Sequence, residues 1–111
     1  MKTQLTLDLE KTLYAYWQEQ GATVVEEVTM PDNRGIVDTL VRQKQQDATI
    51  WRCFELKVTK ADFHSSAKLS FIGHYNYFVL SQRLYTAVAS EIPHGIGVFT
   101  YHPFSKAAIA A

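Results

Sequence analysis

The stretch formed by residues 51–58 constrains the fold most, because this best candidate for a buried strand also carries two opposite charges. Its aromatic, β-branched and other apolar residues are typical of a strand inside a sheet. Glu55 and Lys57 leave the same face of that strand, about 6.6 Å apart along it. Buried charges cost desolvation free energy unless they pair or bind something. A fold for this chain must therefore give both side chains a partner.

Length and composition predict an ordinary globular domain. The chain has 111 residues, of which 47% are apolar and 20% charged, enough for one hydrophobic core and unlike a disordered segment. No apolar run reaches the ~18 residues of a membrane helix, and the first residues lack the apolar core of a secretion signal. We therefore expect a cytoplasmic protein without a membrane partner, with one domain at residues 1–105 and a frayed or truncated tail at 106–111.

The cysteine content and the net charge limit which metal sites and nucleic-acid surfaces the chain can form. Cys53 is the only cysteine, so neither a disulfide within the chain nor a cysteine-based metal site is available. The formal net charge is zero, so a nucleic-acid partner would have to bind a local basic cluster. Residues 51–68 contain such a cluster, in which Arg52, Lys57, Lys60 and Lys68 outnumber two acidic residues.

Apolar periodicity and turn residues predict a mixed α/β fold. Apolar residues at helical spacing indicate a helix from about residue 6 or 8 to residue 20, ended by Gly21. The remaining predicted elements are strands at 22–30, 36–43 and 48–58 (the second and third joined by a tip at 42–47), a helix at about 60–70, a strand at 75–81, a helix at 82–89 and a strand at 96–101. We expect an antiparallel meander, then strands reached through helices, with helices on both faces of the sheet.

Asp38 interrupts an otherwise apolar row of the second predicted strand. If the hairpin turn centres near Gln46, Asp38 lies opposite Glu55. Two neighbouring carboxylates form an oxygen site of the kind that binds Mg²⁺, which needs only one or two protein carboxylates beside its waters. Lys57 would point into the same space. The sequence therefore places two acids and a lysine together.

This combination is typical of phosphodiester hydrolysis. A bound metal ion polarises the phosphodiester and lowers the pKa of a water, while an ammonium orients that water or offsets charge growing on the phosphate. The alternative is structural, because a Glu-x-Lys pattern on a strand by itself more often forms a cross-strand ion pair at the end of a sheet. Asp38 favours the metal site without excluding the ion pair.

Asp38 followed, after sixteen residues, by Glu55-Leu56-Lys57 resembles the motif of the PD-(D/E)XK nuclease superfamily. Residues 58–79, and especially 60–63, Lys68 and 75–79, are similar to the MmcB-like group of small DNA-repair-associated proteins and their phage relatives. The resemblance spans roughly residues 10–101. It implies a restriction-endonuclease-like αβββαβαβ core.

The resemblance also implies an activity, namely Mg²⁺-dependent endonucleolytic or resolvase-like cleavage of DNA in repair, replication or recombination. Mn²⁺ would substitute for Mg²⁺, and no small-molecule cofactor is expected. Asp38, Glu55 and the backbone carbonyl of Leu56 would bind the metal, and Lys57 would be the catalytic lysine. Val37 stands where the family's name-giving proline would be, which is a chemically minor departure.

The superfamily commonly takes a further acid from its first helix, which makes Glu10 the matching residue here. Glu26 or Glu27, on opposite faces of the first predicted strand, are alternatives. The choice among these three acids stays open.

Residues that follow the predicted strand with Glu55 and Lys57 are candidates for DNA contacts. Lys60, His64 and Lys68 follow that strand on one predicted helix, although a solvated helix face explains His64 and Lys68 equally well. Asp62, three residues after Thr59, is expected to cap the helix rather than to bind a ligand.

Two other functions fit the same sequence. The chain could be a DNA-binding or partner-binding accessory of a repair or replication assembly, with the charges as a structural ion pair. It could also be a purely structural domain of a larger assembly. A homodimer is a separate hypothesis, because cutting both strands of a duplex usually needs two active sites.

Overall fold

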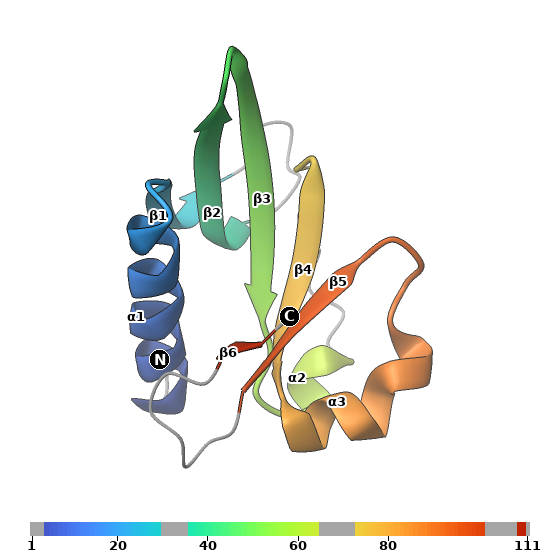
Figure 1. Cartoon of the computed structure of the whole chain (residues 1–111). Helices are drawn as coiled ribbons and strands as arrows, with labels where there is room; N and C mark the ends of the chain where they lie inside the picture. The colour runs from blue at the N-terminus through green and yellow to red at the C-terminus, as the bar shows by residue number, and fades with distance from the viewer. Residues whose placement is uncertain (1–3, 30–35, 65–72, 102–108, 111) are drawn as a thin grey trace.

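The computed structural model describes residues 4–29, 36–64, 73–101 and 109–110, the last two by their backbone alone. These residues form one mixed sheet with the strand order β1-β2-β3-β4-β5-β6 and three α-helices (Figure 1). The elements are α1 (Gln4–Glu19), β1 (Thr23–Thr29), β2 (Ile36–Gln45), β3 (Ala48–Leu56), α2 (Lys60–Phe63), β4 (Tyr75–Ser81), α3 (Gln82–Val88), a 3-10 helix η1 (Ala89–Glu91), β5 (Gly97–Tyr101) and β6 (Ile109–Ala110). Within the described ranges, no helix is long and apolar enough to cross a membrane.

The strand pairing changes from antiparallel to parallel after the third strand, as the sequence predicted. Strands β1, β2 and β3 form an antiparallel meander, and β4 and β5 then add in parallel through connections that carry the helices. A mixed α/β fold is thereby confirmed. Strand β6, which lies in the predicted tail, pairs antiparallel with β5 at Thr100 and Tyr101.

Several boundaries differ from the prediction. Strand β2 continues to Gln45, which pairs with Ala48, so the hairpin tip is shorter than the predicted segment 42–47. Gln46 takes a left-handed φ of 54° there, which allows the tight reversal. The predicted extension of α2 to about residue 70 falls mostly on 65–72, outside the described residues.

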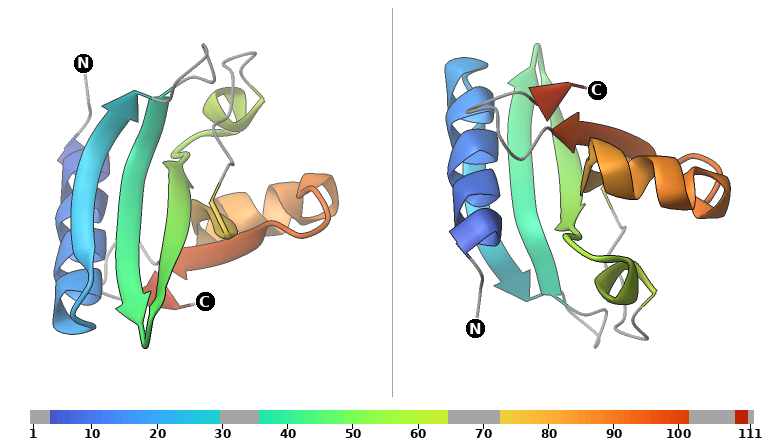
Figure 2. Two further views of the ribbon diagram at one scale, coloured as in Figure 1. Left: turned by 90° about the horizontal axis from the view of Figure 1, so that it is seen from above. Right: turned by 90° about the horizontal axis from the view of Figure 1, so that it is seen from below.

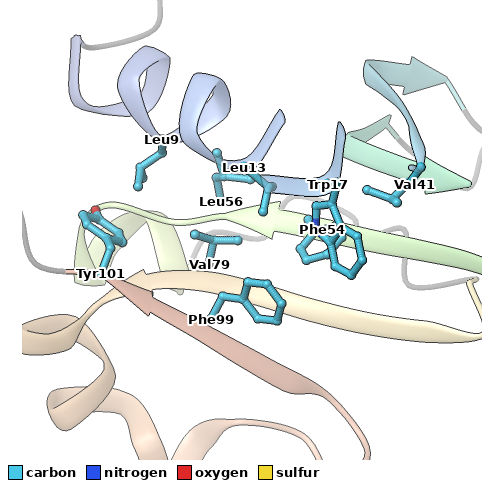
Figure 3. Close-up of a cluster of buried hydrophobic side chains, with 10 residues drawn as sticks. Leu9, Leu13, Trp17, Val41, Phe54, Leu56, Val79, Phe99 and Tyr101 are labelled. Atoms are coloured by element: carbon cyan, nitrogen blue, oxygen red, sulfur yellow. The ribbon is translucent and has the colours of Figure 1, made fainter. Parts of the chain in front are cut away.

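Helix α1 covers one face of the sheet, and α2 and α3 lie on the other (Figure 2). Leu9, Leu13 and Trp17, spaced four residues apart, form one stripe of α1 that packs on β3, β4 and β5 (Figure 3). Phe54 is fully buried in this layer, with its ring centroid 4.8 Å from that of Tyr77 and 5.4 Å from that of Phe99. This layer is the largest of the three hydrophobic clusters formed by the described residues.

The second layer forms where β4 runs directly into α3. Phe78 and Leu80 of β4 pack against Leu84 and Val88 of α3. The hydroxyl of Ser81 accepts a hydrogen bond from the backbone N–H of Leu84 at 3.0 Å and so caps the helix. Because Glu55 pairs with Phe78, the face that carries this second layer is also the face of the candidate site.

Tyr101 provides a stability prediction. Its buried hydroxyl has no hydrogen-bond partner among the described residues, and burial raises the pKa of the phenol. Replacing it by Phe should change the free energy of unfolding near pH 7 by less than about 1 kcal/mol, because no hydrogen bond is lost.

The pH dependence of the two proteins should differ. The pKa of the phenol is about 10 in the unfolded chain and higher in the folded protein, so the wild-type protein should lose stability as pH rises from about 10 through the folded pKa. Urea unfolding between neutral and strongly alkaline pH measures the stability of both proteins. Tyr101→Phe should lack this alkaline loss. Equal alkaline losses would show that Tyr101 is not the group responsible.

Candidate active site

The β2–β3 hairpin brings Asp38 next to Glu55. Thr39 pairs with Phe54 at the end of the β2–β3 ladder, and Asp38 and Glu55 are the next residues of the two strands beyond that pair. The carboxylate of Asp38 accepts a hydrogen bond from the backbone N–H of Leu56 through Oδ2, at 2.9 Å. The side chain of Asp38 is therefore held at the backbone of the residue that follows Glu55.

Side-chain alternation decides which face carries the site. Phe54 and Leu56 pack in the layer under α1, so Glu55 between them leaves the opposite face, beside Phe78. Lys57 follows two residues later, and its backbone N–H donates to the carbonyl of Val79 at 3.1 Å, which continues the alignment with β4. Glu55 is 4% exposed and Lys57 7%, whereas Asp38 is half-buried.

The chain is anchored immediately after Lys57 by the start of α2. The Thr59 hydroxyl accepts from the N–H of Asp62 at 3.0 Å, as a helix cap does. The Asp62 carboxylate accepts from the N–H of Val58 at 3.2 Å. The expected role of Asp62 in capping is confirmed, although its side chain reaches one residue further back than in a capping box.

Asp62→Ala should lower the free energy of unfolding by about 1–2 kcal/mol, because the Val58 N–H loses its acceptor next to the buried Lys57. Asp62→Asn keeps a side-chain oxygen in place and should retain most of that stability. Chemical denaturation of both variants measures the difference. Equal losses in the two variants would show that the carboxylate charge, and not the hydrogen bond, matters.

Within the described ranges, no third acid joins Asp38 and Glu55. Among the residues described, no group of three or more His, Cys, Asp and Glu side chains is placed to hold one metal ion. Glu10 is buried, but it belongs to α1, which packs on the opposite face of the sheet.

The two candidate third acids on β1, Glu26 and Glu27, differ in their position relative to Asp38. Glu26 pairs with Thr39, which pairs in turn with Phe54 of the layer under α1. Glu27 lies between the pairs Glu26–Thr39 and Val28–Val37, at the level of Asp38. Glu27 has a left-handed φ of 55°, which is uncommon for a residue with a side chain and interrupts the β1–β2 ladder at that point. By backbone position, Glu27 is therefore the nearest to Asp38 of the three candidate third acids, Glu10, Glu26 and Glu27.

Two of the three predicted DNA-contacting residues, Lys60 and His64, lie in the described part of the chain, at the two ends of α2. Lys60 is exposed at the first position of α2, and Lys68 lies outside the described residues. His64 Nε2 lies 2.7 Å from Oε1 of Glu91, with both side chains more than two-fifths exposed, so His64 connects α2 to η1. This contact is an unpredicted role for His64.

Arg52 also differs from the expectation of one basic cluster. Its guanidinium lies between the rings of Trp17 and Tyr75, with its central carbon 5.0 Å from each centroid, and donates to Gln43 Oε1 at 2.6 Å. It thus faces α1, away from Lys57. Sequence reasoning missed this arrangement because Trp17 and Tyr75 are distant from Arg52 along the chain.

Comparison of the chain with models of protein families, with curated proteins and with solved structures found no match to any of the three.

Proposed function

We propose that this chain is a metal-dependent DNA endonuclease or resolvase-like phosphodiesterase of the PD-(D/E)XK type, with Asp38, Glu55 and Lys57 as its active site. One observation carries the proposal: the hydrogen bond from the Leu56 N–H holds the Asp38 carboxylate across the hairpin from Glu55. The buried Lys57 follows on the same face. A carboxylate pair with a lysine at this spacing fits phosphodiester hydrolysis better than it fits ordinary strand packing.

The donor atoms at the site suit Mg²⁺ or Mn²⁺. The hydrogen bond from Leu56 uses Oδ2 of Asp38, and the carboxylate has a second oxygen, Oδ1. Together with Glu55 and the carbonyl oxygen of Leu56, the site offers hard oxygen ligands only. Mg²⁺ is commonly held by one or two carboxylates, with waters and substrate phosphate filling its other positions. The lack of a third acid in the described part of the chain is compatible with that mode of binding.

Each residue would have a distinct task. A bound metal ion would supply Lewis-acid activation of the phosphodiester and of a water. Asp38, tied to the backbone of β3, would keep one ligand at a fixed distance from Glu55. Lys57, held at low exposure, would place a positive charge where negative charge grows on the phosphate, and low solvent access strengthens that interaction.

DNA is the proposed substrate because of the motif resemblance and the order of elements. A helix, an antiparallel three-strand meander, a helix and a parallel strand agree with the core that the resemblance implies. Since the net charge is zero, few phosphate contacts are available, and we expect binding to weaken only modestly with salt.

The test is a cleavage assay with the purified chain on plasmid, single-stranded, flapped and branched DNA, each with Mg²⁺, Mn²⁺ or a chelator. The proposal expects metal-dependent cleavage of at least one substrate. Absence of cleavage on all four, by protein that binds Mn²⁺ at Asp38 and Glu55, would contradict nuclease function while leaving the metal site intact.

A second candidate function is a non-catalytic accessory that binds DNA or a protein partner on the same fold. The observation that favours it is the zero net charge, because long, non-specific DNA binding by counterion release needs several Lys or Arg contacts. Calorimetric titration with Mg²⁺ and Mn²⁺ separates the two functions. No metal binding, together with undiminished stability of Glu55→Gln, would favour the accessory.

A further inference from the structure

Arg52 carries a positive charge that no acid of the described residues neutralises. Its guanidinium lies between the rings of Trp17 and Tyr75, and its Nη1 donates to the neutral amide of Gln43 at 2.6 Å. None of the described Asp and Glu side chains forms an ion pair with it, and its Nε is buried without a hydrogen-bond partner. A charge with restricted access to water costs free energy unless an opposite charge pairs with it. The positive charge of Arg52 is therefore available to an anionic ligand.

Tyr75 provides a flat aromatic surface beside this charge. It pairs with Arg52 in the parallel β3–β4 ladder, so both side chains leave the same face of the sheet. Tyr75 is 50% exposed, and Arg52 is the only group of the described residues that stacks on its ring. Trp17, in contrast, is 6% exposed and packs beside Phe54 in the layer under α1 (Figure 3). Tyr75 is thus the ring of the pair that a ligand can reach.

The chemistry of the two groups selects their ligand. An anion would pair with Arg52, and a second planar ring would cover the open face of Tyr75. An acidic peptide supplies the anion without the ring. A nucleotide of a single strand supplies both, because phosphate pairs with arginine and a base stacks on tyrosine. A base inside a duplex is already stacked between its neighbours, so its face cannot reach a protein ring.

We propose that Arg52 and Tyr75 bind an unpaired nucleotide of single-stranded nucleic acid. The base stacks on the open face of Tyr75, and a phosphate of the same strand pairs with the guanidinium of Arg52. Both side chains lie on the α1 face of the sheet, opposite to the face that carries Glu55 and Lys57. This contact needs no metal ion and does not depend on the proposed nuclease activity.

The test measures binding of a labelled oligothymidylate by fluorescence anisotropy, with a chelator present so that neither metal binding nor cleavage contributes. Tyr75→Ala should weaken binding at least about fivefold, because it removes the stacking surface, whereas Tyr75→Phe keeps the ring and should stay within about twofold of the wild-type protein. Tyr14→Ala is the matched control and should also stay within about twofold, because Tyr14 is 38% exposed on α1 and its hydroxyl accepts from Gln18.

The salt dependence of the same binding separates the charge from the ring. Arg52→Met should reduce the slope of the logarithm of affinity against that of salt concentration by about 0.7, the value for one phosphate contact with a single strand. Tyr75→Ala should leave this slope unchanged and weaken binding at every salt concentration. Arg83→Met changes an exposed arginine on α3 and should leave both the affinity and the slope unchanged.

A strand of the same length without bases completes the test. It keeps the phosphates, and the wild-type protein should bind it at least about fivefold more weakly than oligothymidylate. Equal affinity for the two strands, equal affinity of Tyr75→Ala and the wild-type protein, or an unchanged salt slope in Arg52→Met would overturn the proposal. Tighter binding to polyglutamate than to oligothymidylate, lost in Arg52→Met, would identify an acidic peptide as the ligand instead.

Discussion

Glu55→Gln, Asp38→Asn and Lys57→Met should each lower the rate of metal-dependent DNA cleavage by roughly 10²–10³-fold or more. The first two variants replace the carboxylate of a proposed metal ligand by a neutral amide of the same shape, and the third removes the ammonium from a buried position. Initial rates of plasmid nicking under saturating Mn²⁺ measure the effect. Rates should be compared with thermal unfolding of each variant, so that loss of the fold is not mistaken for loss of chemistry.

Matched exposed residues serve as controls for the same chemical changes. Glu19→Gln on α1, Asp47→Asn in the hairpin turn and Lys44→Met on β2 alter exposed side chains away from the site. These variants should cleave at close to the wild-type rate. Undiminished cleavage by folded Glu55→Gln and Lys57→Met would mean that a contaminating nuclease or a different site is responsible.

Phe54→Ala should produce the largest loss of stability, about 3–5 kcal/mol. Phe54 is completely buried, and its ring contacts those of Trp17, Tyr77 and Phe99, which join α1, β4 and β5. Removing the ring leaves a cavity that these aromatic side chains cannot collapse to fill. Such a loss is a large part of the 5–15 kcal/mol that holds a typical domain folded.

Equilibrium unfolding in urea measures this change, with Leu7→Ala as the control. Leu7 is 40% exposed on α1, and alanine is at least as good a helix former, so this variant should stay within about 0.5 kcal/mol of the wild-type protein. A loss below about 1 kcal/mol for Phe54→Ala would contradict the packing described for this layer.

The sequence predicted best those features that depend on neighbouring residues. Alternation in β2 identified which side chains share the face of Asp38, and the short reversal at Gln46 aligned Thr39 with Phe54, the pair next to Asp38 and Glu55. The cap formed by Thr59 and Asp62 was likewise recognisable, because its hydrogen bonds span only a few residues. Local rules of strand register and helix capping account for these results.

Other features depend on contacts between distant segments and were not predictable. Whether α1 packs on the face of Glu55 or on the other face cannot be read from helical periodicity, so the sequence left Glu10 among the candidate ligands. The left-handed backbone at Glu27 has no local signal, because only tertiary context stabilises that conformation in a residue with a side chain. The contacts of Arg52 with two aromatic rings and of His64 with Glu91 are similarly long-range.

The central claim is that Asp38 and Glu55 form a metal site, and an anomalous difference map from a crystal soaked in Mn²⁺ tests it most directly. We predict one strong peak about 2.0–2.3 Å from a carboxylate oxygen of each residue, which is the range for oxygen ligands of such ions, and no peak in crystals of Glu55→Gln. A map without density between Asp38 and Glu55, at a Mn²⁺ concentration that supports cleavage, would contradict the claim.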